Sequence, residues 1–177
     1  MTLNFRDATV DDIPALVALV TSAYRGESSR AGWTTEADLL DGNRIAPEVL
    51  REDIEREHSR VIVASRDGAM LGCAHVAIED GAGYFGMFAV DPQRQAGGLG
   101  KAILAEAERV VRDDWQLPVM RMTVIDLRED LIAWYERRGY RRTGIKKPFP
   151  AVDPRFGLPK RGDLRFEVLE KALRDGR

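Results

Sequence analysis

The chain has 177 residues, of which 44% are hydrophobic and 32% charged, and its formal net charge is −2. This length suits one domain covering residues 1–177, and the balanced charge lacks the clustered basic surface that nucleic-acid binding needs. A single cysteine, Cys73, excludes an intrachain disulfide. Together with His58 and His75, which lie far from one another in sequence, it does not form a zinc-binding pattern. We therefore expect a globular protein that binds neither nucleic acid nor metal.

The sequence carries no sign of export or of membrane insertion. Residues 1–7 lack the charged and then apolar pattern of a signal peptide. No apolar run is long enough to cross a bilayer. Cys73 lies in an apolar stretch, which is typical of a buried thiol in a reducing compartment. These patterns predict a cytoplasmic protein that does not interact with membranes.

The first quarter of the chain predicts a strand and two helices. Residues 3–6 indicate a short strand, and Thr9 is expected to cap a helix that continues to about Tyr24. Residues 25–35 are polar and contain glycine, which favours a loop. Pro47 suits the first position of another short helix.

The middle of the chain predicts three consecutive antiparallel strands. Residues 60–66 and 69–78 flank Asp67-Gly68, which is a strong hairpin signal. The glycine-rich turn at 80–83 then leads into a third strand at 84–90.

The remaining elements alternate between helices and strands. A helix follows a glycine cluster, with apolar residues recurring from Leu99 to Val111. A strand at 119–125 precedes a helix at 128–138, for which Gly139 is the expected cap. Two last strands are expected at 140–145 and 164–169. The predicted fold is α/β (α+β), with a mixed, mostly antiparallel sheet of six to seven strands flanked by helices.

The segment from Gln95 to Lys101 carries the strongest chemical signal. It joins a strand to a helix, and helix N-termini offer unpaired N–H groups and partial positive charge. Glycines let such a backbone approach a phosphate closely. A P-loop would need glycine at Gln95 and a hydroxyl residue at Ala102, and a dinucleotide fingerprint from Gly98 would need glycine at position 103. Both of these phosphate motifs therefore fail.

The pattern that remains is Q-x-x-G-x-G at Gln95, Gly98 and Gly100. It resembles the pyrophosphate-binding motif of the GNAT superfamily of acyl-CoA-dependent N-acetyltransferases. A second match, Tyr-Glu-x-x-Gly-aromatic, runs from Tyr135 to Tyr140. The two motifs come in the family's order, and the expected elements match the family along the whole chain.

This resemblance implies acetyl-CoA as a co-substrate. Backbone N–H groups of the glycine turn would hold its pyrophosphate, and the preceding strand end would pair with pantetheine. Phe88 or Ala89 would present a backbone N–H to the thioester carbonyl. Lys101 and Arg128 would add charge, although each also fits a solvated helix surface. The implied CoA-binding residues are Phe88, Ala89, Val90, Gln95, Ala96, Gly97, Gly98, Leu99, Gly100, Lys101 and Arg128.

The resemblance also implies that Tyr135 is the general acid that protonates the departing thiolate. The alternative is a tyrosine that only packs its ring in the core. Many relatives carry a glutamate base at the position of Tyr84, so the base is left open. Three candidates lie upstream of it in sequence, namely His75, Glu79 and Asp80.

The predicted activity is acetyl transfer to the primary amine of a small-molecule or amino-acid-like acceptor. A non-catalytic acyl-CoA-binding module and a protein N-terminal or lysine acetyltransferase are the alternatives. In the family, loops corresponding to 24–36 and 146–163 select the acceptor, which the sequence does not identify. Edge strands near the C-terminus would allow a homodimer.

Overall fold

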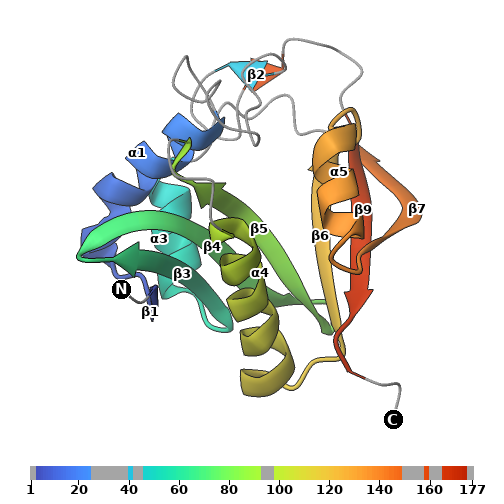
Figure 1. Ribbon diagram of the computed structural model, residues 1–177, viewed down its shortest axis with the longest axis horizontal. Helices are drawn as coiled ribbons and strands as arrows, with labels where there is room; N and C mark the ends of the chain where they lie inside the picture. The colour runs from blue at the N-terminus through green and yellow to red at the C-terminus, as the bar shows by residue number, and fades with distance from the viewer. Residues whose placement is uncertain are drawn as a thin grey trace.

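The computed structural model describes residues 3–24, 46–92, 98–148 and 165–174, and the backbone of two short strands at 40–41 and 158–159. Its main feature is a seven-stranded sheet in the order β1-β3-β4-β5-β6-β9-β7 (Figure 1). The strands are β1 (Asn4–Asp7), β3 (Ser59–Arg66), β4 (Ala69–Glu79), β5 (Ala82–Val90), β6 (Val119–Ile125), β7 (Arg141–Pro148) and β9 (Arg165–Ala172). All neighbours are antiparallel except β5 and β6.

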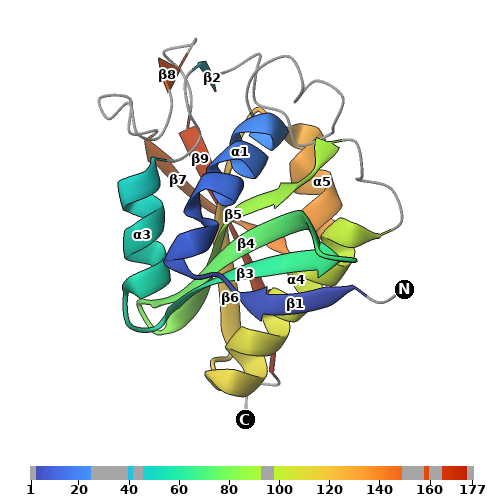
Figure 2. The same cartoon turned by 90° about the vertical axis from the view of Figure 1, so that its left-hand side faces the viewer.

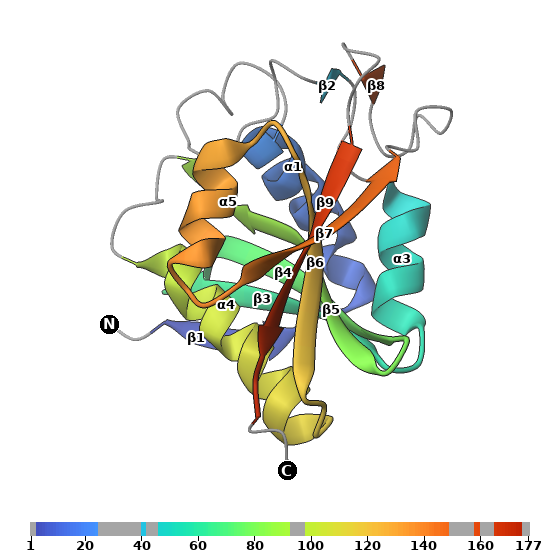
Figure 3. The same cartoon turned by 90° about the vertical axis from the view of Figure 1, so that its right-hand side faces the viewer.

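Helices cover both faces of this sheet, as Figures 2 and 3 show from two sides. They are α1 (Ile13–Tyr24), α3 (Pro47–Glu55), α4 (Leu99–Arg109) and α5 (Glu129–Glu136). A second, two-stranded sheet pairs β2 (Leu40–Asp41) with β8 (Leu158–Pro159). None of the helices within the described ranges combines the length and hydropathy needed to span a membrane. The mixed sheet confirms the predicted fold class, and the β2–β8 pair was not foreseen.

The start of α1 follows from the capping sequence. A single 3-10 turn, Val10–Asp12, precedes the helix, and the Thr9 backbone N–H donates to the Asp12 carboxylate at 2.8 Å. Arg6 from β1 also binds this carboxylate, at 2.8 Å. The Arg6 hydrogen bond, together with the Thr9 N–H, lowers the pKa of Asp12 to about 2. The strand and the helix are therefore joined by one charged residue at the predicted helix start.

Each face of the sheet has its own apolar core. On one face α1 and α3 pack on β3, β4 and β5, with the side chains of Leu16, Val20, Leu50, Val61, Val63, Cys73, Met87 and Ala89 among those buried. On the other face α4 and α5 cover Ile62, Ala64, Phe85, Phe88, Met120, Met122, Val124 and Leu169, among others. In β3 the side chains alternate regularly, so Val61 and Val63 lie on one face and Ile62 and Ala64 on the other.

Two glycines set how closely α4 approaches the sheet. A Cβ on Gly72 would lie 2.5 Å from the Ile103 side chain and 2.8 Å from the Ala89 carbonyl oxygen. A Cβ on Gly83 would lie 2.5 Å from Val111. These distances are shorter than real side-chain contacts, so both positions require glycine for α4 to lie where it does.

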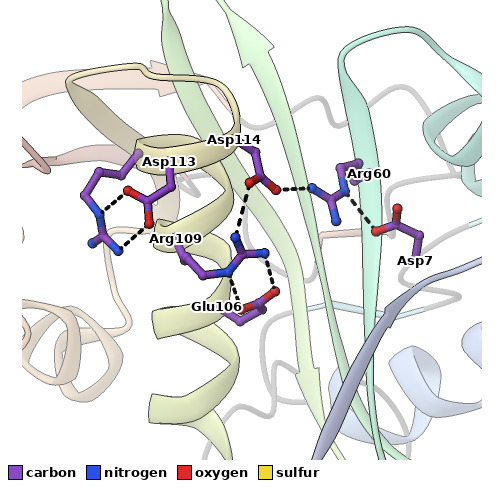
Figure 4. Close-up of polar contacts among 7 residues, drawn as sticks. Asp7, Arg60, Glu106, Arg109, Asp113 and Asp114 are labelled. Carbon is purple, nitrogen blue, oxygen red and sulfur yellow. Dashed lines mark hydrogen bonds and ion pairs between the residues drawn. The ribbon is translucent and has the colours of Figure 1, made fainter.

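The C-terminal end of α4 is fixed by charged side chains (Figure 4). The helix continues into a π turn, Val110–Asp114, which the sequence did not predict. Asp114 accepts hydrogen bonds from Arg60 of β3 at 2.9 Å and from Arg109 at 3.2 Å. Arg60 also donates to Asp7 of β1 at 2.9 Å. The end of the helix is thereby connected to two strands of the sheet.

Candidate functional site

The site begins where β5 and β6 separate. These parallel strands pair only at Gly83–Met120 and Tyr84–Arg121, after which β6 continues to pair with β9 and β5 with β4. Figure 1 shows the two strands diverging from this point. Within the described residues, the edge of 85–90 that faces β6 therefore has no strand partner. Such an edge presents backbone donors and acceptors to a ligand.

A β-bulge interrupts β5 in this stretch, where the strand pairs with β4. Cys73 pairs with Ala89 and His75 with Gly86, so two residues of β5 oppose one residue of β4. Met87 is the bulged residue and has a φ of +46°. A bulge re-aims the side chains that follow it. No sequence signal predicts this bulge, because methionine is not a residue that favours positive φ.

The bulge brings two aromatic rings to one face of β5. Phe85 and Phe88 are three residues apart, which in a regular strand would place them on opposite faces. Their ring centroids are instead 5.3 Å apart, and both pack in the core under α4 and α5.

Tyr135 of α5 packs against this aromatic pair. Its ring centroid lies 6.4 Å from those of both Phe85 and Phe88, and the residue is only 4% exposed. The structure thus brings the residue expected as general acid to the strand expected to hold the thioester. These two segments are far apart in sequence and meet only in the fold.

Tyr140, the aromatic residue of the same motif, is in a different electrostatic setting. Its hydroxyl donates to Glu108 at 2.8 Å, and Lys171 holds the same carboxylate at 3.1 Å. Burial, and then the Glu108 charge, raise the pKa of Tyr140 far above its usual value. Because its proton is committed to Glu108, Tyr140 serves as a structural neighbour of Tyr135, whose ring is 5.8 Å away.

The N-terminus of α4 follows the end of β5. Gly98 caps the helix with a φ of +78°, and a Cβ there would meet open space. Leu99 and Gly100 are buried, and Lys101 is exposed. The remaining residues expected in this turn, Gln95, Ala96 and Gly97, lie outside the described residues. Phe88, Ala89 and Val90 are buried at the end of β5.

Arg128 is the N-cap residue of α5. Its backbone N–H donates to the Ile125 carbonyl at 2.9 Å, and its carbonyl accepts from Ile132 at 3.0 Å. Its side chain is half-buried. The residue therefore shapes the start of the helix that carries Tyr135.

The opposite face of the sheet carries a polar cluster formed by Ser59 of β3, His75 of β4 and Asp53 of α3. The Ser59 hydroxyl lies 2.7 Å from His75 Nε2 and 2.6 Å from the Asp53 carbonyl oxygen. A carbonyl only accepts, so the hydroxyl proton goes to Asp53, and His75 donates through Nε2–H. Burial, and then Arg56, lower the pKa of His75 to about 4, so its ring is neutral at neutral pH. Burial raises the pKa of Asp53 to about 6.

The three candidate bases lie in different places. His75 is buried beside Tyr84, with ring centroids 6.1 Å apart. Glu79 and Asp80 are exposed at the far end of the β4–β5 hairpin, and the Glu79 carboxylate is 3.9 Å from Arg56. No group of three or more metal-ligating side chains occurs among the residues that the structure describes.

Comparisons with known proteins point to one family. The family model for an acetyltransferase (GNAT) domain matches residues 29–149. An amino-acid acetyltransferase from Azotobacter vinelandii is 26% identical over 172 residues, which cover 96% of this chain and 34% of that protein. The chain thus spans about a third of the length of the curated relatives it matches.

Solved structures show the same fold at low sequence identity. The ribosomal-protein-S18-alanine N-acetyltransferase from Escherichia coli superposes with a TM-score of 0.73 at 15% identity, covering 99% of this chain and 97% of that one. The PaiA N-acetyltransferase from Thermoplasma acidophilum, in complex with coenzyme A, has a TM-score of 0.66 at 16% identity, with coverage of 97% and 99%.

Proposed function

Because the chain belongs to the GNAT acetyltransferase family, we propose that it transfers an acetyl group from acetyl-CoA to a primary amine. The acceptor in this proposal is a small molecule or is amino-acid-like. The names of the curated relatives support an amino-acid-like acceptor, although those proteins are about three times longer than this chain. The wider family uses acetyl-CoA, and a neighbour in fold was solved with coenzyme A.

One observation carries the proposal. Tyr135 packs against Phe85 and Phe88 on the stretch of β5 that has left β6. In the reaction, the acceptor nitrogen forms a bond to the thioester carbon and loses a proton, and the carbon–sulfur bond breaks. The departing thiolate takes the Tyr135 hydroxyl proton. A phenol with an ordinary pKa of about 10 stays protonated at neutral pH and can donate to a thiolate whose conjugate acid has a pKa of about 8.5.

The described residues fit the CoA moiety in two places. Residues 88–90 offer the backbone edge along which pantetheine would lie, with the N–H of Phe88 or Ala89 directed to the thioester oxygen. Such a donor contributes about 3 kcal/mol to transition-state stabilisation. The N-terminus of α4 at Gly98 would receive the pyrophosphate, together with Lys101 and the turn before it. Arg128 would approach the phosphates from α5.

Two further expectations remain proposals. The first is a cytoplasmic location. The second is a homodimer, for which the position of β7 at the edge of the sheet gives support. Its residues are largely exposed, and among the described residues no strand pairs with its outer edge, which would leave that edge to a second copy.

The test is release of free thiol from acetyl-CoA in the presence of amino acids, polyamines or short peptides. Tyr135→Phe should lower kcat by about a hundredfold, the usual contribution of a positioned acid, and leave the KM for acetyl-CoA unchanged. Tyr140→Phe is the matched control, because it removes a buried hydroxyl from the same cluster and leaves Lys171 on Glu108. We expect its kcat to stay close to that of the wild type.

Three outcomes would change the proposal. An unchanged kcat in Tyr135→Phe, under conditions where chemistry limits the rate, would remove Tyr135 from the mechanism. Thiol release only with peptides would favour a protein acetyltransferase. If no amine in the panel gave thiol release while CoA still raised the melting temperature, a non-catalytic CoA-binding module would replace the enzyme.

A further inference from the structure

The side chain of Tyr84 lies along its own strand, over Gly86, which is two residues further on. A Cβ on Gly86 would lie 2.8 Å from both Cε1 and the hydroxyl oxygen of Tyr84. Gly86 does not have a positive φ, so its backbone does not require glycine. A methyl group added at this position would have to displace the tyrosine ring above it.

This arrangement places the Tyr84 phenol next to the bulge. Gly86 immediately precedes the bulged residue Met87, and Tyr84 is the last residue of β5 that pairs with β6. The ring therefore starts at the point where the strands separate and runs towards the stretch of β5 that has left β6. The edge contact with His75, at 6.1 Å, supports it from β4.

The side chain of Tyr84 points to one face of β5, and Tyr135 of α5 packs against the other face. Tyr84 alternates with Phe85, and Phe85 faces the core that contains Tyr135. That face is occupied around Tyr135 by the rings of Phe88, Trp134 and Tyr140. Tyr84 itself is only half-buried. Further along that face α1 covers Met87 and Ala89. A small polar molecule would therefore reach Tyr84 at the edge of β5, where the strand leaves β6.

We propose that the Tyr84 hydroxyl binds the acceptor amine by accepting a hydrogen bond from it. In this proposal Gly86 leaves the space in which the Tyr84 ring lies, and so positions the ring for this contact. The inference rests on the proposed acetyl transfer and deepens it by assigning the acceptor side of the site. With Tyr135 on one face for the leaving thiolate and Tyr84 on the other for the amine, the two substrates meet at the edge of β5 that has left β6. No proton transfer to Tyr84 is part of this proposal.

The experiment uses four variants and whichever acceptor in the panel gives the fastest thiol release. Tyr84→Phe keeps the ring over Gly86 and removes the hydroxyl. It should lower kcat/KM for the acceptor about fivefold to tenfold, the effect of one lost hydrogen bond. The KM for acetyl-CoA should not change. Gly86→Ala keeps the hydroxyl and displaces the ring, and it should lower kcat/KM for the acceptor at least as much.

The remaining two variants test whether Gly86 acts through Tyr84. In a Tyr84→Ala background there is no ring to displace, so Gly86→Ala should have no further effect on kcat/KM for the acceptor. An equal effect of Gly86→Ala in both backgrounds would show that Gly86 does not act by positioning the Tyr84 ring. Unchanged kcat/KM for the acceptor in Tyr84→Phe, or an equal rise in the KM for acetyl-CoA, would overturn the role of Tyr84.

Failure of this inference can be told apart from failure of the proposed function. Wild-type protein that releases no thiol with any amine contradicts acetyl transfer itself. Thiol release that Tyr84→Phe leaves unaltered contradicts only the assignment of Tyr84. Melting temperatures of all four variants identify any that do not fold. If Gly86→Ala is among them, the comparison of Tyr84→Phe with the wild type still decides the role of the hydroxyl.

Discussion

The two ends of α4 are built in opposite ways. At its N-terminus, Gly98 has a left-handed φ of +78°, and the space where its side chain would lie is open. At its C-terminus, a π turn and the ion pairs of Asp114 with Arg60 and Arg109 join the helix to the sheet (Figure 4). Helix ends leave backbone groups unsatisfied, and proteins normally supply partners for them.

The two ends of α4 therefore have different roles. The C-terminal end attaches the helix to the sheet, and the N-terminal end is the one expected to bind a ligand. The C-terminal end is held by ion pairs and by the contact of Val111 with Gly83, and the middle packs on Gly72 through Ile103. A helix fixed in this way can present its other end to a ligand without moving. We therefore expect substitutions at the N-terminal end to act on CoA binding, and those in the middle or at the C-terminal end to act on stability.

The largest effect is expected for Gly98→Glu. Its carboxylate would occupy the open space at the helix N-terminus and exclude a pyrophosphate by like charge, so CoA binding should become undetectable in calorimetry. Gly98→Ala is the matched control, because it imposes the same backbone strain without the charge. Micromolar CoA affinity retained by Gly98→Glu would contradict the assignment of this turn to the phosphates.

A smaller effect, on stability alone, is expected for Gly72→Ala. The added methyl group would collide with Ile103 and with the Ala89 carbonyl, and overpacking of this kind costs about 1–3 kcal/mol. Chemical denaturation should show this loss, and CoA affinity per folded molecule should change much less than in Gly98→Glu. A variant as stable as the wild type would show that α4 can shift away from the sheet at little cost.

The smallest effect is expected for Arg60→Gln, which removes the link between Asp7 and Asp114. These groups are partly exposed, so the loss should be about 0.5–1 kcal/mol and should shrink as salt is added. Arg112→Gln is the control, because the Arg112 ion pair is with the adjacent residue Asp113. If both variants lose the same stability, the connection to the sheet contributes nothing specific.

Local sequence signals predicted most of the elements. The Asp67-Gly68 hairpin forms with both residues at positive φ, and α1 ends at Tyr24 as predicted. Gly139 has a φ of +98° after α5, in agreement with its expected role as a cap. These features depend on residues close together in the chain, whose preferred backbone angles and alternation of apolar side chains are readable without the fold.

Other features depended on contacts between distant segments. The bulge at Met87 and the separation of β5 from β6 follow from how neighbouring strands pair, and no residue in either strand signals them. The π turn after α4 likewise follows a helix whose periodicity continues through it. The sequence shows that Tyr84 stands where many relatives carry a glutamate. It does not show where the ring of Tyr84 lies.

The sequence by itself determined the order of elements, the glycine turn before α4 and the identity of Tyr135 as the candidate acid, because each is encoded in a short run of residues. Only the tertiary structure decided that Tyr135 packs on the aromatic face of β5, that Tyr84 lies over Gly86 on the other face, and that His75 is buried and neutral. The physical reason is that burial, strand register and the face to which a side chain points are set by partners far away in sequence.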